Sequence, residues 1–289
     1  MNIVSYNIRG GGNPLKQRRI KECLMKGKAD LCFLQETKIK SISGKIVNSL
    51  WSDCGVEWSA HDSRGQSGGL LIMWKMDVFS PVFSFGGTGL IGICGNFGGK
   101  QCFFVNVYSP CDLLSKRKLW EDLLSLRSKW GGGEWCLGGD FNTVRFPSEH
   151  IGRSNSQRSQ DSHEFNDFIG LMNLIDLPTS HRKFTWCKGG VGGAMRRIDR
   201  FLLSDGMVSL LCADCQVVGR KDISDHSPIW LDCNSQNWGP KPFRTLNTLP
   251  EHPGLVEFVD KEWKALRIKG SCAFVVKEKF RCLKESLRS

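Results

Sequence analysis

The stretch Glu134-Trp-Cys-Leu-Gly-Gly-Asp-Phe-Asn142 decides how the rest of the chain is interpreted. Its apolar run from Trp135 to Leu137 predicts a buried strand. The two glycines that follow let the backbone turn sharply and let a ligand approach it closely. Asp140 and Asn142 then lie at the end of a rigid strand, where a scaffold can hold catalytic groups in fixed geometry. The alternative is a plain Gly-Gly-Asp turn in which Asn142 is a turn residue.

Other predicted strands also end in polar side chains. In chain order these are Asn7 after residues 3–6, Glu36 after residues 30–34, Tyr108 at the end of residues 102–108, and Asp225 with His226 before residues 229–231. The predicted strand of residues 197–203 carries one carboxylate, Asp199, among apolar side chains. Asp199 needs a neutralising neighbour, because an unpaired buried charge is costly.

This set of side chains suits the cleavage of a phosphodiester bond. Glu36 is a hard oxygen ligand that can hold Mg²⁺, which keeps several waters and binds the substrate phosphate. Asp140 can orient or deprotonate the attacking water. His226, kept charged by Asp199, can neutralise the negative charge that develops on the phosphate oxygens. No single one of these residues is persuasive evidence for this chemistry, but their order and contexts together are.

In six ordered motifs the chain resembles the endonuclease/exonuclease/phosphatase superfamily. The matching motifs are Ser5-Tyr-Asn-Ile-Arg-Gly10, Leu34-Gln-Glu-Thr37, Val107-Tyr-Ser-Pro110, Gly138-Gly-Asp-Phe-Asn142, Arg197-Ile-Asp-Arg-Phe201 and Ser224-Asp-His226. The resemblance implies a four-layer α/β/β/α sandwich, in which two packed and mainly antiparallel sheets are flanked by helices. Within the superfamily the chain most resembles the endonuclease domain of plant LINE-type (non-LTR) retrotransposon polyproteins.

The resemblance also implies a role for each site residue. The implied catalytic residues are Tyr108, Asp140, Asn142, Asp199 and His226. The implied ligands of Mg²⁺, for which Mn²⁺ can substitute, are Glu36, Asn7 and Asp225. The implied substrate-binding residues are Arg9, Thr185 and Arg197. The implied enzyme is a DNA endonuclease that nicks one strand, leaves a 3′-hydroxyl and a 5′-phosphate, and needs no small-molecule cofactor.

Two departures from the abasic-site endonucleases weaken a repair function. Those enzymes have Asn where this chain has Cys111, and Asp where it has Arg9. Abasic-site repair stays open as an alternative, and so does a catalytically inactive remnant that binds nucleic acid through its basic surface. The candidates for reading DNA shape are a surface loop, Arg145–Gln160, and the turn Gly189–Arg196. We expect the next helix to open at a capping box that begins with Asp161.

Composition limits the class of protein. A net charge of +11 over 289 residues suits a polyanionic partner such as DNA, although it does not demonstrate one. The thirteen cysteines are an odd number and lie mostly in apolar segments, which is typical of a reducing compartment. The sequence contains no apparent secretory signal and no apolar run long enough for a membrane span. We therefore expect a nuclear or cytoplasmic monomer that does not bind membranes.

The composition changes near residue 234. We assign residues 1–233 to the nuclease domain. The following stretch, residues 235–242, is rich in prolines and poor in apolar side chains, as linkers are. Apolar residues at helical spacing then predict an amphipathic helix around Val256–Leu266. We expect residues 234–289 to be a linker with a helical tail, which resembles a truncated connector to an absent reverse transcriptase.

Overall fold

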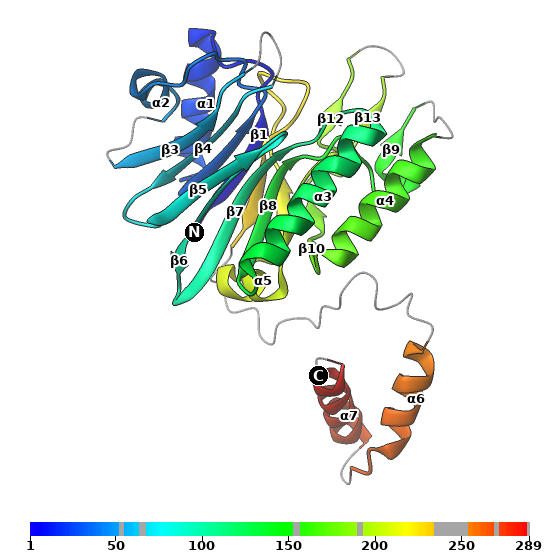
Figure 1. The fold of residues 1–289 in the computed structure, drawn as a ribbon. Coiled ribbons are helices and arrows are strands. Elements are labelled where there is room, and N and C mark those ends of the chain that lie inside the picture. The colour runs from blue at the N-terminus through cyan, green and yellow to red at the C-terminus, as the bar shows by residue number, and fades with distance from the viewer. Residues whose placement is uncertain are drawn as a thin grey trace. The chain divides into compact units, whose positions relative to one another are not determined.

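Two large β-sheets form the centre of the fold (Figure 1). The computed structural model describes residues 1–51, 55–63, 68–152, 157–189, 193–233, 254–268 and 272–287. The chain divides into two compact units, Met1–Gln236 and Asn237–Ser289. Both large sheets lie in the first unit, and the second contains helices α6 (Leu255–Ala265) and α7 (Cys272–Ser286). No helix among the described residues is long and apolar enough to cross a membrane.

The first sheet has seven strands, of which β1 and β2 lead to the candidate site. Its order is β11 (Thr179–Ser180), β15 (Cys215–Val218), β16 (Ile229–Asp232), β1 (Ile3–Asn7), β2 (Leu31–Gln35), β4 (Leu70–Lys75) and β3 (Val56–His61). Only the pairs β1/β2 and β11/β15 are parallel. The first pair is parallel because helix α1 (Pro14–Lys26) carries the chain back between its two strands.

The second large sheet has six strands. Its order is β10 (Ile175–Asp176), β14 (Asp199–Leu203), β8 (Glu134–Asp140), β7 (Lys100–Tyr108), β6 (Leu90–Phe97) and β5 (Pro81–Gly87), and only β7/β8 is parallel. A third, small sheet joins β12 (Trp186–Cys187), β13 (Met195–Arg196) and β9 (His150–Ile151).

The helices cover the outer faces of the two large sheets. Helices α1 (Pro14–Lys26) and α2 (Gly44–Leu50) pack on the seven-stranded sheet, and α3 (Leu113–Trp130) and α4 (Gln157–Leu171) pack on the six-stranded sheet. Short helix α5 (Asp205–Leu211) and the 3₁₀ turn η1 (Pro147–Glu149) complete the unit. A separate apolar core, which includes Phe33, Phe104 and Phe201, fills the space between the sheets. The predicted four-layer α/β/β/α sandwich is thus confirmed.

The topology brings the polar strand ends to one edge of the sandwich. Parallel pairing places Asn7 opposite Gln35 and places Tyr108 opposite Asp140. Strand β14 runs antiparallel to β8, so its first residue, Asp199, also lies opposite Asp140. Gly139 makes this approach possible, since a Cβ there would overlap the backbone carbonyl of Val107 and its φ of +156° lies outside the range of ordinary side chains.

Two local predictions are wrong. The expected surface loop Arg145–Gln160 contains the buried side chains of Arg145 and Glu149, and its last four residues already belong to α4. The helix therefore begins at Gln157, and Asp161 lies inside it instead of capping it. The carboxylate of Asp161 accepts a hydrogen bond from Lys116 on α3, with an N–O distance of 2.6 Å.

Candidate active site

Asn7, at the end of β1, donates hydrogen bonds to two carboxylates. One is that of Glu36, the predicted metal ligand, and the other is that of Asp140, which is predicted to position the attacking water. The amide Nδ2 of Asn7 donates to Oε1 of Glu36 at 3.0 Å and to Oδ2 of Asp140 at 2.9 Å. Asn7 is fully buried, and Asp140 is 1% exposed. One amide therefore fixes the spacing of two acidic side chains that come from different sheets.

A buried acid–histidine–acid row lies beside this pair. The Nδ1 atom of His226 lies 2.9 Å from Oδ2 of Asp199, and its Nε2 atom lies 3.8 Å from Oδ2 of Asp140. The hydroxyl of Thr185 accepts hydrogen bonds from the backbone N–H groups of Ile198 and Asp199. Thr185 is 1% exposed, so it holds the start of β14 in place under the row.

Three of the predicted site residues adopt the left-handed backbone region. Arg9, Glu36 and Asn142 have φ values of +45°, +50° and +49°. Such values are uncommon for residues other than glycine, and they concentrate at functional sites because the surroundings must enforce them. At Asn142 the backbone N–H donates to Oδ1 of Asp140 and the side-chain Nδ2 donates to the carbonyl of Ser109, which enforce the turn. The end of β8 is therefore held in a specific conformation by hydrogen bonds of Asp140 and Asn142 and is not a plain turn.

The pKa shifts in this row make His226 a proton donor and Asp140 a proton acceptor. Burial raises the pKa of Asp140, and the charge of Asp199 raises it further, while His226 opposes both. Burial lowers the pKa of His226, but Asp199 and Asp140 outweigh burial and raise it to about 9. At neutral pH the imidazole is thus charged, and Asp140, whose pKa rises to about 7, can both hold and release a proton.

Glu36 remains ionised at the mouth of the site. Burial raises its pKa, but hydrogen bonds from Asn7 and Lys38 outweigh burial and lower it. Tyr108 donates a further hydrogen bond to Glu36, and burial together with the negative charge of Glu36 raises the pKa of the Tyr108 phenol. Tyr108 is therefore a neutral hydrogen-bond donor next to the carboxylate.

The donor set fits a hard divalent cation. Within the described ranges, Asp140, Asp199 and His226 form the one group whose possible ligand atoms all lie within 4.8 Å of one another. A charged imidazole is a poor metal ligand, however, because only the neutral ring has a free lone pair. Glu36, which Asn7 holds beside Asp140, offers the carboxylate oxygens that Mg²⁺ prefers. A cation there would also stabilise the buried charge of Asp140.

Two predicted substrate-binding residues have other partners. The guanidinium of Arg197 lies 2.9 Å from Glu149 and 2.7 Å from Asp176, and the residue is 9% exposed. The charge of Arg197 is therefore neutralised inside the fold. Arg9 does lie at the site, where its guanidinium pairs with Asp225 at 2.5 Å. The indole Nε1 of Trp186 donates to the same oxygen of Asp225 at 2.8 Å.

Several supporting residues escaped the sequence reasoning. Lys38 lies 3.2 Å from Oε2 of Glu36 and adds positive charge at the site. Lys116 is 1% exposed, and its Nζ donates to the carbonyl of Asn142 at 3.0 Å. Asn106, below the site, donates to backbone carbonyls of both β2 and β4. A lysine on a basic helix and an asparagine inside a strand give no signal that distinguishes them from surface or turn residues.

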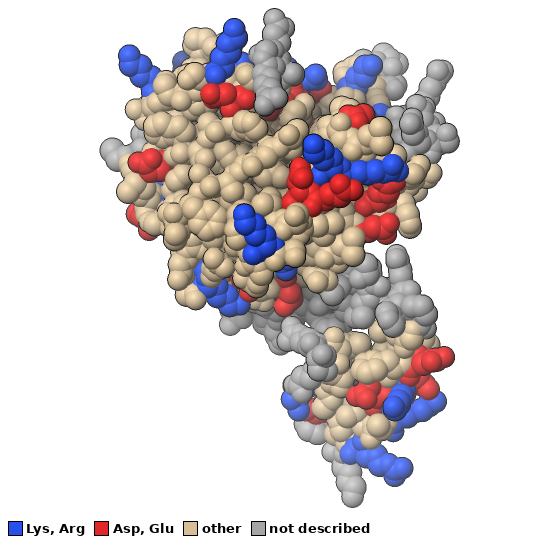
Figure 2. Space-filling view, in the orientation of Figure 1, with Lys and Arg blue, Asp and Glu red and all other residues tan. Residues whose placement is uncertain are grey.

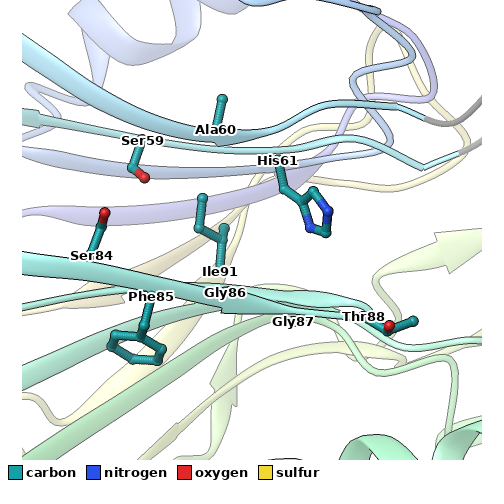
Figure 3. Close-up of a pocket in the computed structure, with 9 residues that line it drawn as sticks. All are labelled: Ser59, Ala60, His61, Ser84, Phe85, Gly86, Gly87, Thr88 and Ile91. Atoms are coloured by element: carbon teal, nitrogen blue, oxygen red, sulfur yellow. The ribbon is translucent and has the colours of Figure 1, made fainter.

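Cavities at two places among the described residues differ in how close they lie to the site. One of about 500 Å³ lies between the edge strands β3 and β5, with His61 and Thr88 among its lining residues (Figure 3). None of the site residues named above lines it. The other, of about 410 Å³, is lined in part by Asn142, Lys116 and Arg196, and so adjoins the site directly.

The raised pKa of His226 predicts how stability depends on pH. Folding raises this pKa from about 6.5, so the charged ring stabilises the fold fully below about pH 6.5 and loses that effect as the pH approaches 9. In metal-free buffer, the advantage in unfolding free energy of the wild type over His226→Gln is expected to shrink by about 3 kcal/mol between pH 6 and pH 9.5. Urea unfolding at both pH values measures it, with exposed His163→Gln as control. A difference that stays constant or grows would contradict the charged imidazole.

Comparison with solved structures finds the same fold in enzymes that act on DNA. The AP endonuclease LMAP from Leishmania major matches with a TM-score of 0.61 and 14% identity over 80% of this chain and 86% of its own. The 3′ phosphatase NExo from Neisseria, bound to a product DNA hairpin, matches with 0.62 and 17% over 80% and 98%. The endonuclease domain of TRAS1, a telomere-specific non-LTR retrotransposon, matches with 0.59 and 15% over 81% and 99%.

Sequence comparison gives the family itself. No curated protein matches the chain. The profile of the Endonuclease/Exonuclease/phosphatase family matches residues 4–226, which include every strand end of the site from Asn7 to His226. On this match over more than two thirds of its length, together with the four-layer sandwich, the chain belongs to the Endonuclease/Exonuclease/phosphatase family.

Proposed function

We propose that this chain is a Mg²⁺-dependent DNA endonuclease that nicks one strand and leaves a 3′-hydroxyl and a 5′-phosphate. The observation that carries the proposal is the amide of Asn7, which holds Glu36 and Asp140 together beside the charged His226. This arrangement provides a metal ligand, a proton acceptor and a cation around one point. In-line attack on a phosphodiester by water needs all three.

Each residue of the site then has a separate task. Mg²⁺ held by Glu36 would supply positive charge to the substrate phosphate and help to orient it. Asp140, with its raised pKa, accepts the proton of the attacking water. The charged ring of His226 donates from Nε2 to a phosphate oxygen, because Asp199 holds its Nδ1 side. Tyr108 adds a neutral hydrogen-bond donor at the same edge.

DNA as substrate is supported by the comparisons and by charge near the site. The fold is shared with an AP endonuclease, a retrotransposon endonuclease and a phosphatase bound to a DNA hairpin. Figure 2 shows Lys and Arg side chains scattered among Asp and Glu over the face in view, so net charge alone marks no binding surface there. The cations that matter line the site, where Arg9 and Lys38 flank Glu36. Their positive charge favours binding of DNA phosphates at the site.

The cavity beside Asn142 offers room for the sugar or base next to that bond. Its lining combines the cationic side chains of Lys116 and Arg196 with the apolar side chain of Ile198. Arg196 itself lies over the ring of Trp186, 5.2 Å from its centroid. A mainly polar lining that includes a cationic side chain suits a nucleotide better than a lipid.

A plasmid assay tests the proposed function. Supercoiled DNA incubated with the full chain and Mg²⁺ is expected to become open-circular, and EDTA is expected to stop the reaction. The double variant Asp140→Ala/His226→Ala, purified in the same way, controls for contaminating nucleases. Nicking that is equal in the wild type and the double variant would overturn the proposal. End-labelling of the nick with and without prior phosphatase treatment identifies the expected 5′-phosphate.

The same assay separates the two alternatives. An abasic-site repair enzyme would cleave a duplex with one abasic site far faster than intact DNA, and Cys111 and Arg9 argue against this preference. An inactive remnant would bind DNA in a salt-sensitive manner without nicking it. The hydrogen-bonded arrangement of Asn7, Glu36 and Asp140 favours a working site.

A further inference from the structure

Arg9 occupies the space between two carboxylates at the entrance of the site. Its Nη1 atom lies 2.5 Å from Oδ2 of Asp225, and its Nε atom lies 3.9 Å from Oε2 of Glu36. Trp186 donates to the same Asp225 oxygen. Oδ2 of Asp225 therefore already has two donors, one of them charged, before any metal ion arrives.

The loop around Arg9 is built to hold it there. Its backbone N–H donates to Oδ1 of Asn7 at 3.1 Å, and its carbonyl accepts from Nζ of Lys16 at 3.1 Å. The next N–H, of Gly10, donates to the carbonyl of Glu36 at 2.7 Å. These bonds enforce the left-handed backbone of Arg9, whose side chain is 49% exposed at the rim of the site.

Positive side chains already occupy the space around these two carboxylates. Arg9 pairs with Asp225 and approaches Glu36, and Lys38 pairs with Glu36 as well. A second divalent ion at Asp225 would have to displace the guanidinium of Arg9 or lie against it, and like charges this close repel strongly in a partly buried site.

We propose that the guanidinium of Arg9 takes the place of a second divalent cation, so that the site binds a single metal ion at Glu36 and Asp225 anchors Arg9 instead of binding metal. The proposal rests on the metal-dependent function above and refines its metal site. It also gives a physical meaning to a sequence difference, since the abasic-site endonucleases have Asp at this position. With an acid there, positions 9 and 225 would together offer two carboxylates to an ion.

Manganese binding tests the proposal without any DNA. Electron paramagnetic resonance of free Mn²⁺, titrated into the full chain, is expected to show one bound ion per wild-type molecule. Arg9→Asp is expected to bind two, because it removes the internal cation and adds a ligand. Asp225→Asn is expected to keep one ion with its affinity changed less than about threefold. Glu36→Gln is expected to lose that ion.

Arg18→Asp on α1 is the matched control, since it makes the same charge change at a side chain that is 77% exposed. It is expected to keep one ion. Two ions on the wild type, one ion on a folded Arg9→Asp, or loss of the ion in Asp225→Asn would each overturn the proposal. Nicking measured on the same samples keeps the two ideas apart, because two bound ions with full nicking would overturn only the single-metal site. One bound ion without nicking would overturn only the proposed function.

Discussion

Replacing Asp140 with asparagine is expected to lower Mg²⁺-dependent nicking by about 10²- to 10⁴-fold. Asparagine keeps the shape of the side chain and an oxygen that can accept from the N–H of Asn142, but it cannot take a proton from water. Folding raises the pKa of Asp140, so its ionised form is unfavourable in the folded chain. The variant also loses the negative charge beside His226 and one of the two oxygens that accept from Asn7 and Asn142, so a loss of activity reports chemistry only where thermal unfolding shows that the variant is folded. Initial rates of plasmid nicking and thermal unfolding in EDTA measure the two effects.

Glu36→Gln should fail in a different way. Glu36 is assigned to the metal, so its variant is expected to recover part of its activity at high Mg²⁺ or with Mn²⁺, whereas Asp140→Asn is not. Glu57→Gln, on an exposed position of edge strand β3, controls for loss of a carboxylate elsewhere. The assignment of Glu36 to the metal and of Asp140 to proton transfer is wrong if both variants respond equally to metal, or if Asp140→Asn loses less than about tenfold in rate.

The sequence was sufficient to predict which residues meet at this edge. Glu36, Tyr108 and Asp140 each follow or end an apolar run, and strands of such composition end at a sheet edge. Crossover helices α1 and α3 make β1/β2 and β7/β8 parallel, and parallel strands present their carboxyl ends together. The apolar pattern of each strand and the order of strands and helices along the chain therefore explain how these strand ends come together.

The sequence could not predict partners that depend on distant and very short elements. Arg197 stands in a matching motif two residues before Asp199, and this adjacency made it a candidate for substrate binding. Its actual partner Asp176 lies in β10, a strand of two residues that shows no periodicity. The Asp161 capping box failed for a related reason. An acidic residue followed three positions later by Glu occurs often by chance. The carboxylate of Asp161 instead accepts a hydrogen bond from Lys116 on the neighbouring helix.

Arg197 belongs to a buried cluster of charged side chains, and we expect disruption of this cluster to lower the unfolding free energy strongly. Three guanidinium groups, those of Arg145, Arg197 and Arg200, surround the carboxylate of Asp176 at N–O distances of 3.2, 2.7 and 2.7 Å. Glu149 pairs with two of them. The side chain of Arg200 is 0% exposed, so water cannot replace a lost partner. Burial raises the pKa of Asp176, but the three arginines outweigh it and lower it, so Asp176 remains charged near neutral pH.

Asp176→Asn is therefore expected to reduce the unfolding free energy by about 3–5 kcal/mol, because removing one partner of a buried ion pair leaves uncompensated charge. Urea unfolding at pH 7 measures the loss. Asp167→Asn on α4 is the control, since its side chain is 58% exposed and the change should stay within about 0.5 kcal/mol. A loss below about 1 kcal/mol for Asp176→Asn would mean that Glu149 alone neutralises the cluster. The cluster matters for catalysis because Arg200 directly follows Asp199 in β14, so the strand that positions His226 is anchored by the same buried charges.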